Sequence, residues 1–323
     1  RDAQESRGLG DVYKRQEIIR SLSSMSQQHT VVVVTGPTGS GKSALAVQLA
    51  LNLGCDIISA DSRQIYKHIP IGTAAPTPQQ RAAVPHHFVD MLELDQYYSA
   101  AQFEHDVLEL LPRMWHKSPY AVVCGGSMMY IDALCYGIDD IPLVDPQVRQ
   151  EAWNIFYSGG IDALRARLLE LDPVHYSRVD LNNPKRMVHA IEVTMQGGTP
   201  YSSLCTGMRR SRPWRIVKLA IDMPRTMLFD RINRRVMDMI EAGWEDEARA
   251  VYHLRHLNSL NTVGYKELFA CFSGAMSRDT AIARIAKNTR VYAKKQLTWL
   301  KRQDDVVWIP YNQPFESTLN LIK

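Results

Sequence analysis

The stretch VVVVTGPTGSGKS, residues 31–43, constrains the fold of this chain more than any other feature of its sequence. It begins with four valines, an apolar run typical of a central parallel strand that is buried on both faces. The loop that follows fits the pattern G-x-x-x-x-G-K-[ST], and apolar residues at helical spacing continue as far as Gly54. A strand, a glycine-rich loop and a helix in this order form an anion site, because backbone N–H groups and the helix N-terminus face one concavity.

We therefore predict that this loop binds a di- or triphosphate. In such a loop Lys42 reaches the outer phosphate and Ser43 can hold Mg²⁺. The loop alone does not say whether the phosphates are transferred, hydrolysed or released. The predicted phosphate-binding residues are Gly36, Pro37, Thr38, Gly39, Ser40, Gly41, Lys42 and Ser43.

Further apolar segments predict an α/β fold with a doubly wound parallel sheet, because they alternate with helical segments. Ligands of such sheets bind beyond the carboxyl ends of the strands, so the residues that follow each strand are candidates for a site. The chain after Asp222 has helical patterns over most of its length. We expect strands at 31–34, 55–62, 120–127, 215–222 and 305–310, and late helices at 225–242, 245–256, 265–272 and 279–301.

The sheet pattern stops over residues 141–204, where three prolines each follow a good N-cap residue. The N-caps are Asp145, Asp172 and Asn183, and Gly197-Gly198 ends the last of these helices. We therefore predict a P-loop α/β core domain, residues 29–140 and 205–323, that is interrupted by an inserted helical subdomain. Its C-terminal part is helical.

The first 28 residues, which lack an initiating Met and an apolar period, are interpreted as a disordered or non-native leader, with Met25 as the candidate start. The rest suits a well-cored protein, with 45% hydrophobic and 22% charged residues in the whole chain. The five cysteines show no metal spacing and read as reduced core thiols of a cytosolic protein. No apolar run is long enough to predict a membrane segment.

Basic residues are unevenly spread, although the net charge is only +4. Residues 278–302 hold eight Lys or Arg against one acid, and residues 208–218 hold five with no acid. Such runs are usually solvated faces, so charge alone leaves nucleic-acid binding open.

Acidic and basic side chains near the strand ends are the candidates for chemistry. Asp61 and Asp222 each end a predicted strand, where a carboxylate could accept a proton or hold a metal through water. Asp61 could instead cap an Asx turn. Arg231 and Arg235 lie four residues apart and share a helix face, which suits a phosphate group but is also common on exposed helices.

Several blocks of sequence, taken together and in order, resemble the tRNA dimethylallyltransferase family, also called tRNA isopentenyltransferases. The resemblance spans about residues 31–310. The blocks are GPTGSGKS, ISADSRQIYKHIPIGTAAPT, PHHFVDMLELDQYYSAAQF, VVCGGSMMYIDAL, NNPKRMVHAIEV, NTVGYKEL and KKQLTWLKR.

The resemblance implies an activity. Enzymes of this family transfer the five-carbon group of dimethylallyl diphosphate to the exocyclic N6 amine of the adenosine just 3′ of the anticodon, position 37, in tRNAs reading codons that start with U. Diphosphate leaves, so electrostatic stabilisation by the loop, Mg²⁺ and an Arg is expected to matter most. By resemblance, Asp61 is the general base, while Thr38 and Arg235 contact the diphosphate and complete the catalytic set.

The resemblance also implies contacts with the anticodon stem-loop, whose adenine has to flip out of its stack to react. Ser127 stands where the family usually has Thr and retains the hydroxyl. The basic helix with Lys294 and Lys295 becomes a candidate phosphate-backbone surface. The implied tRNA-binding residues are Asp61, Ser62, Arg63, Gln64, Ser127, Arg149, Lys185, Arg186, Met187, Val188, His189, Asn261, Thr262, Val263, Gly264, Tyr265 and Lys266.

We therefore predict a cytoplasmic, monomeric prenyltransferase of tRNA that uses Mg²⁺ and has no membrane association. Three alternatives remain open from the sequence. Related enzymes prenylate free adenine nucleotides, and other P-loop proteins are small-molecule kinases or triphosphatases that bind ATP. A non-enzymatic RNA-binding module would explain the basic helix but would give the loop and Asp61 no function.

Overall fold

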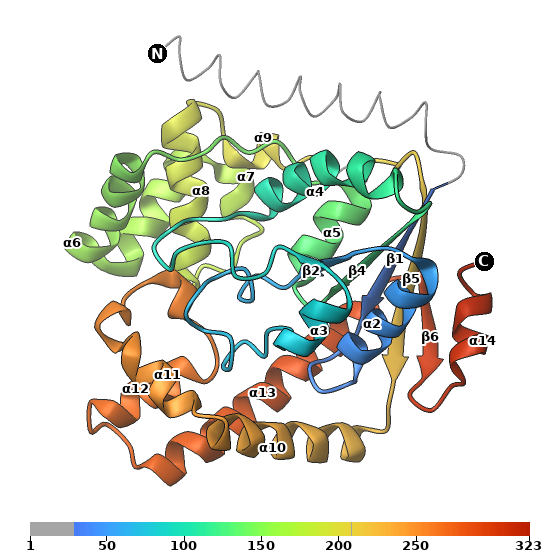
Figure 1. Ribbon diagram of the computed structural model, residues 1–323. Helices are drawn as coiled ribbons and strands as arrows, with labels where there is room; N and C mark the ends of the chain where they lie inside the picture. The colour runs from blue at the N-terminus through green and yellow to red at the C-terminus, as the bar shows by residue number, and fades with distance from the viewer. Residues whose placement is uncertain (1–28, 208) are drawn as a thin grey trace. The chain divides into compact units, whose positions relative to one another are not determined.

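The computed structural model describes residues 29–207 and 209–323, which form two compact units (Figure 1). An α/β unit consists of residues 29–135 and Arg212–Lys323, and a helical unit consists of Tyr136–Ser211. The inserted part expected at 141–204 falls a few residues inside the limits of the helical unit. The predicted leader, residues 1–28, lies outside the described residues.

The α/β unit is built on one sheet of six parallel strands, in the order β3-β2-β4-β1-β5-β6. This arrangement confirms the predicted doubly wound α/β class. One strand, β3, was not predicted, because its two residues are too few to show a periodic pattern. The strands are β1 (Thr30–Thr35), β2 (Ile57–Ala60), β3 (His86–His87), β4 (Tyr120–Gly125), β5 (Arg215–Asp222) and β6 (Val306–Pro310).

The strand that leads into the phosphate loop lies at the centre of the sheet. All six residues of β1 are buried, and Val31 pairs with Ala121 of β4 on one side and with Ile216 of β5 on the other. Beyond β4, Ala60 of β2 lies opposite Gly125. Because these strands are parallel, the turns that follow β1, β2 and β4 leave the same edge of the sheet.

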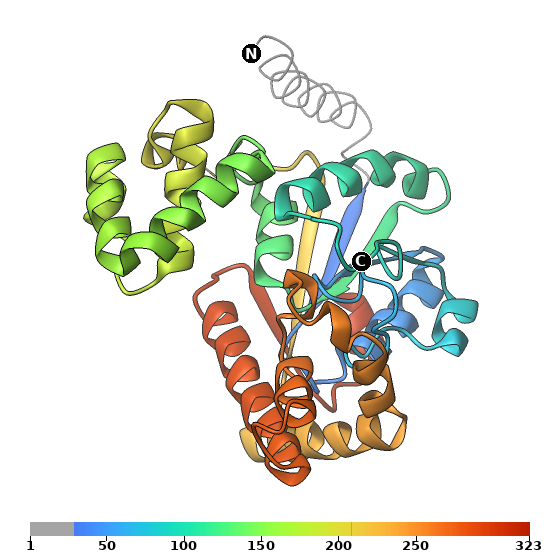
Figure 2. The ribbon, with the colours of Figure 1, turned by 90° about the vertical axis from the view of Figure 1, so that its left-hand side faces the viewer.

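The helices of the α/β unit are longest toward its C-terminal end. Figure 2 shows α10 and α13 side by side, where Leu228 and Ile232 pack against Ala293. The single helix expected at 245–256 was wrong: α11 ends at Ala250 and a short 3-10 helix follows, in which the Tyr252 ring packs against aromatic rings of α12. The helices are α2 (Lys42–Leu53), α3 (Pro78–Ala83), α4 (Ala100–Trp115), α5 (Met128–Tyr136), α10 (Arg225–Glu241), α11 (Trp244–Ala250), α12 (Tyr265–Phe272), α13 (Arg278–Leu300) and α14 (Phe315–Asn320), with 3-10 helices at Tyr252–Leu254 and Asn258–Leu260.

The helical unit confirms the three predicted N-caps. The side chains of Asp145, Asp172 and Asn183 each accept a hydrogen bond from a backbone N–H of the following first turn. The long helix α6 is kinked at Gly160, which leaves the helical conformation with φ 69°. The helices are α6 (Pro146–Leu171), α7 (Pro173–Tyr176), α8 (Pro184–Gly197) and α9 (Tyr201–Leu204).

The structure bears on two predictions from composition, one about membrane segments and one about the cysteines. In the part of the chain that the structure describes, no helix is long and apolar enough to cross a membrane. Cys55 and Cys135 are buried, as expected for core thiols, but Cys205 is exposed. The prediction of a core thiol is therefore wrong for Cys205, which directly follows the short helix α9.

Candidate active site

The phosphate loop runs from Gly36 to Gly41 and has the backbone of an anion cradle. Gly36, Gly39 and Gly41 have φ values of 143°, 83° and 99°, a region that residues with a side chain rarely adopt. Gly41 is the N-cap of α2, so the positive end of that helix opens directly into the loop. The hydroxyl of Ser40 is buried and has no hydrogen-bond partner among the described residues, so a donor of the loop itself is unused.

Lys42 is the centre of a group of charges at this loop. Its ammonium donates to the carbonyl of Pro37 at 3.5 Å. Burial is the main cause that lowers the pKa of Lys42; the Cys124 thiol and Asp61 oppose this shift, and the Arg235 guanidinium adds to it. The pKa of Arg235 is also lowered, by burial, with Asp61 again opposing. Two cations held close together at a cost to their charged forms favour a polyanionic ligand.

Asp61 follows β2 and faces the same group of charges. Its Oδ1 accepts hydrogen bonds from the backbone N–H of Arg63 at 2.9 Å and of Gln64 at 3.4 Å, so the Asx turn considered from the sequence is present. The turn uses Oδ1 of the carboxylate. Asp222, the other candidate acid, is exposed at the end of β5 and is not among the charges that act on Lys42.

Ser127 joins the turn after β4 to the turn after β2. Its hydroxyl accepts a hydrogen bond from the backbone N–H of Ser62 at 2.8 Å and lies 3.2 Å from the Ser62 hydroxyl. The amide of Gln64 is occupied within the protein, since it accepts from the Ser59 hydroxyl and donates to the carbonyls of Thr73 and Ala74. The Gln64 side chain therefore supports the turn that contains Asp61 through bonds within the protein.

Two further residues lie near the loop: Arg231, which the sequence analysis considered as a phosphate contact, and Gln296, which it missed. Gln296 of α13 accepts a hydrogen bond from the backbone N–H of Thr38 at 2.9 Å, so this N–H of the loop has a partner within the protein. A Cβ added to Gly41 would lie 3.6 Å from Arg231 Nη2, which places this guanidinium against the loop. Arg231 had a signal in its spacing from Arg235, whereas a lone Gln within KKQLTWLKR gave none.

The residues of the segment 261–266 differ in exposure: some lie on the surface and others in the core. Asn261 and Lys266 are exposed, whereas Tyr265 is fully buried and donates to the carboxylate of Glu247. Burial, followed by Glu247, raises the pKa of Tyr265, which keeps the phenol neutral. A tRNA contact through the side chain of Tyr265 is therefore ruled out in this conformation, and its role is to pack the segment. Thr262 and Val263 are half-buried, and the N–H of Gly264 is taken by Glu267.

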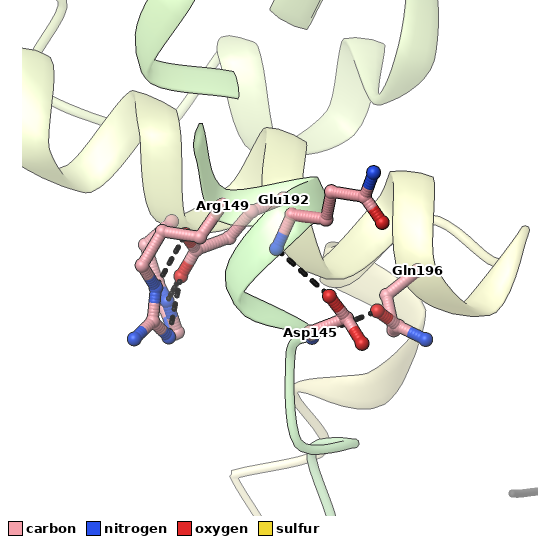
Figure 3. Close-up of polar contacts among 6 residues, drawn as sticks. Asp145, Arg149, Glu192 and Gln196 are labelled. Atoms are coloured by element: carbon pink, nitrogen blue, oxygen red, sulfur yellow. Dashed lines mark hydrogen bonds and ion pairs between the residues drawn. The ribbon is translucent and has the colours of Figure 1, made fainter. Parts of the chain in front are cut away.

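The predicted contacts of the helical unit divide in the same way. On α8, Lys185 and Arg186 are exposed, but Met187 and Val188 are buried in the unit's core, so their side chains cannot reach a partner. Arg149 makes a salt bridge with the buried Glu192, 3.1 Å from Nε to Oε2 (Figure 3).

His189 of α8, which was also predicted to contact tRNA, lies against the same carboxylate. Its Nδ1 is 3.0 Å from Glu192 Oε1. Nearby, the backbone N–H of Asp145 donates to Gln196. Both Arg149 and His189 are thus engaged by one carboxylate of their own unit.

A cation site built from protein ligands alone is not present in the described residues, where no three His, Cys, Asp or Glu side chains gather closely enough to hold a metal. Ser43, the predicted Mg²⁺ ligand, is exposed at the start of α2. Mg²⁺ commonly keeps several waters and is shared between one or two side chains and substrate phosphates. The residues present fit a Mg²⁺ ion of that kind, which would be carried largely by the phosphates.

The fold and the loop place this chain in the class of P-loop α/β proteins, with a glycine-rich phosphate loop beside an acidic turn. Comparison with known proteins narrows the class, because the sequence profile of the family described as IPP transferase matches residues 64–303. The chain belongs to this family.

Individual relatives agree with this assignment. The chain is 51% identical over 280 residues to tRNA dimethylallyltransferase 2 of Parabacteroides distasonis, covering 87% of this chain and 94% of the relative. It is 50% identical over 297 residues to tRNA dimethylallyltransferase 2 of Porphyromonas gingivalis, covering 92% and 99%. Among solved structures, the tRNA isopentenylpyrophosphate transferase of Bacillus halodurans matches with a TM-score of 0.64 and 31% identity, covering 91% of this chain and 94% of that one.

Proposed function

We propose that this enzyme transfers the dimethylallyl group of dimethylallyl diphosphate to the N6 amine of the adenosine 3′ to the anticodon, position 37, in tRNAs that read codons starting with U. One observation carries the proposal: Lys42 and Arg235 gather at the phosphate loop with Asp61 beside them. A site for an anionic leaving group thus lies next to a carboxylate that can take a proton. Membership of the IPP transferase family supports the identity of the transferred group.

The reaction breaks the bond between the allylic carbon and the diphosphate oxygen and forms a bond from that carbon to N6. Negative charge grows on the diphosphate as it leaves, so the loop N–H groups, Lys42 and Arg235 stabilise the transition state. The Thr38 hydroxyl is proposed to contact the same diphosphate. The lone pair of N6 is delocalised into the ring, and Asp61 assists by accepting the proton that N6 loses.

Mg²⁺ bound to the diphosphate and to Ser43 would add charge stabilisation to the leaving group. Ser43 is exposed, and the Ser40 hydroxyl has no hydrogen-bond partner among the described residues. Both are compatible with bound Mg²⁺ and diphosphate. A kinase would instead transfer a phosphoryl group of ATP, and no prenyl group would move to the acceptor.

The tRNA is proposed to bind through its anticodon stem-loop, with the reactive adenine flipped out of the stack. The exposed residues Lys185 and Arg186 of the helical unit, and Asn261 and Lys266 of the α/β unit, are proposed to contact the RNA. Asp61 and the turn that follows it are proposed to receive the flipped base. We further propose that the enzyme acts in the cytoplasm as a monomer.

The direct test uses dimethylallyl diphosphate that is labelled in its carbon chain, together with Mg²⁺ and unmodified tRNA transcripts. We expect label in tRNA that carries adenosine 3′ to the anticodon and none in a matched transcript with guanosine at that position. Label in free adenine nucleotides without tRNA would select the adenylate-prenylating alternative. Transfer of the γ-phosphate of ATP to a small molecule, without prenyl transfer, would select a kinase, and tRNA binding without any turnover would leave an RNA-binding module.

A further inference from the structure

Gln296 is a buried side chain that joins two separate parts of the site. It lies on α13 with 3% of its surface exposed, and both ends of its amide are occupied. Its Oε1 accepts from the N–H of Thr38 in the phosphate loop at 2.9 Å, and its Nε2 donates to the carbonyl of Gly126 at 3.0 Å. A buried amide without partners is costly, so these two bonds fix Gln296 as much as they fix the segments it contacts.

The turn after β4 is shaped to admit this side chain. A Cβ on Gly126 would come within 2.3 Å of Gln296 Nε2, so any residue larger than glycine would displace the amide. The next residue, Ser127, accepts from the N–H of Ser62, the neighbour of Asp61. The hydrogen bonds of Gln296, the peptide link from Gly126 to Ser127 and the bond from Ser62 to Ser127 therefore connect the phosphate loop to the acidic turn.

The helix that carries Gln296 is itself held in place by other side chains. Tyr292, one turn earlier, donates to the same Gly126 carbonyl at 3.3 Å. Trp299, one turn later, donates from Nε1 to Asp132 of α5 at 2.9 Å. Both contacts attach α13 to the segment after β4, and of these three side chains Gln296 is the one that also reaches the phosphate loop.

We propose that Gln296 is a positioning residue that sets the distance between the diphosphate loop and the acidic turn, so that the allylic carbon and the acceptor amine are held in reacting geometry. The inference rests on the proposed function for the identity of the two substrates. A misplacement of about 1 Å between reacting groups can lower the rate by about 10²-fold, which is the scale at stake. Gln296 acts through Thr38 and Gly126 and touches neither substrate in this account.

The first test compares Gln296→Met, which keeps the length and removes both hydrogen bonds, with Trp299→Phe, which removes one anchor of the same helix away from the loop. For Gln296→Met we expect kcat for prenyl transfer to fall by about 10- to 100-fold. The dissociation constant of inorganic diphosphate should rise at least threefold, while that of tRNA stays within twofold. For Trp299→Phe we expect all three values to stay within twofold of wild type.

The second test uses Gln296→Glu, whose protonated carboxyl group can accept from Thr38 and donate to Gly126 as the amide does. We expect the activity of this variant, relative to wild type at each pH, to rise as the pH falls and to exceed that of Gln296→Met. The relative activity of Gln296→Met should not change with pH. A residue that only filled space would not produce this rescue.

The outcomes separate the inference from the proposed function. The inference is overturned if Gln296→Met matches Trp299→Phe in both kcat and diphosphate affinity, or if Gln296→Glu is not rescued at low pH. If the wild-type protein binds diphosphate but labels no tRNA, the proposed function fails. A weaker diphosphate affinity in Gln296→Met would then still support the role of Gln296 in holding the loop.

Discussion

The phosphate loop of the α/β unit and the Glu192 cluster of the helical unit both gather charged side chains, but they treat those charges differently. At the loop, burial lowers the pKa values of both Lys42 and Arg235, and the Arg235 guanidinium adds to the shift of Lys42. In the described chain neither cation forms a salt bridge. In the helical unit, Arg149 and His189 both contact Glu192, whose side chain is 5% exposed.

This difference distinguishes the phosphate loop, whose charges suit an anionic ligand, from the Glu192 cluster, whose charges stabilise the helical unit. Cations kept close without an internal partner are stabilised when a polyanion binds, so they belong to chemistry. Side chains that share a buried carboxylate already have a partner within the protein, and removing the carboxylate affects folding first. The family resemblance implied tRNA contacts for Arg149 and His189, and the structure gives them this internal partner.

The largest expected effect comes from removing the carboxylate at the loop. Asp61→Ala should lower turnover by about 10²-fold or more, because general-base assistance is lost, with tRNA affinity within twofold of wild type. Single-turnover rates with labelled dimethylallyl diphosphate, together with tRNA binding, measure the two quantities. Asp222→Asn, at the exposed end of β5, is the control and should leave turnover unchanged.

Asp61→Asn tests whether the turn or the base matters. The Asn side chain keeps an oxygen for the N–H groups of Arg63 and Gln64 but cannot accept the proton of the amine. We expect its rate to be as low as that of Asp61→Ala. Near-normal turnover in Asp61→Asn would mean that Asp61 serves as a cap of the turn and not as a general base. The loop region would then differ from the Glu192 cluster only in its unpaired cations.

A smaller effect is expected for the second cation at the loop. Arg235→Ala should lower kcat/KM for dimethylallyl diphosphate by about 10- to 100-fold, since a hydrogen bond to a charged group contributes about 1.5–3 kcal/mol. Arg234→Ala, an exposed neighbour on the same helix, is the matched control and should stay within twofold. Equal losses in both variants would assign the effect to the net charge of α10 and would remove Arg235 from the site.

The sequence could predict the loop site because its residues lie next to one another. The glycine spacing, Lys42 and the strand–loop–helix order come from one short stretch, and Asp61 ends the next strand. The contact between Thr38 and Gln296 joins residues 258 positions apart, and no local pattern announces it. The same limit hid β3, whose pairing with β2 depends on tertiary position, and the break at Val251.

In the helical unit the sequence predicted the caps but not which residues of α8 face the core. The tRNA-contact block included Met187 and Val188, which the packing against α6 buries. It also included His189, which Glu192 engages, so Lys185 and Arg186 remain as its exposed cations. Motif membership thus could not separate a contacting side chain from one that shapes the contacting helix.

The cluster around Glu192 should affect stability before activity. Glu192→Gln should lower the free energy of unfolding by about 2 kcal/mol, because Arg149 and His189 lose a charged acceptor. Glu170→Gln is the control, since its salt bridge with Arg167 is largely exposed and should contribute about 0–1 kcal/mol. Urea unfolding at neutral pH gives both values, and an equal loss in the two variants would contradict the role of Glu192.

The same cluster predicts a pH dependence. Burial disfavours the ionised form of Glu192, but hydrogen bonds from His189 and Arg149 outweigh it and hold its pKa below the ordinary 4.5. A carboxylate with a lowered pKa stabilises the folded state above its unfolded-state pKa and loses that contribution as the pH falls through the folded-state value. Wild type should therefore lose its advantage over Glu192→Gln in the same urea experiment as the pH falls below about 4.5.

The smallest effect is expected for the exposed cations of α8. Lys185→Ala or Arg186→Ala should weaken tRNA binding about threefold and reduce the slope of log affinity against log salt by about one, as for the loss of one phosphate contact. The rate at saturating tRNA should not change, because neither side chain lies in the charge group at the loop. Arg167→Ala removes a half-buried cation of the same unit that is paired with Glu170, and it should leave the salt slope unchanged. If the slope is the same in all four proteins, α8 contacts no phosphate, and the helical unit acts on tRNA through its shape alone.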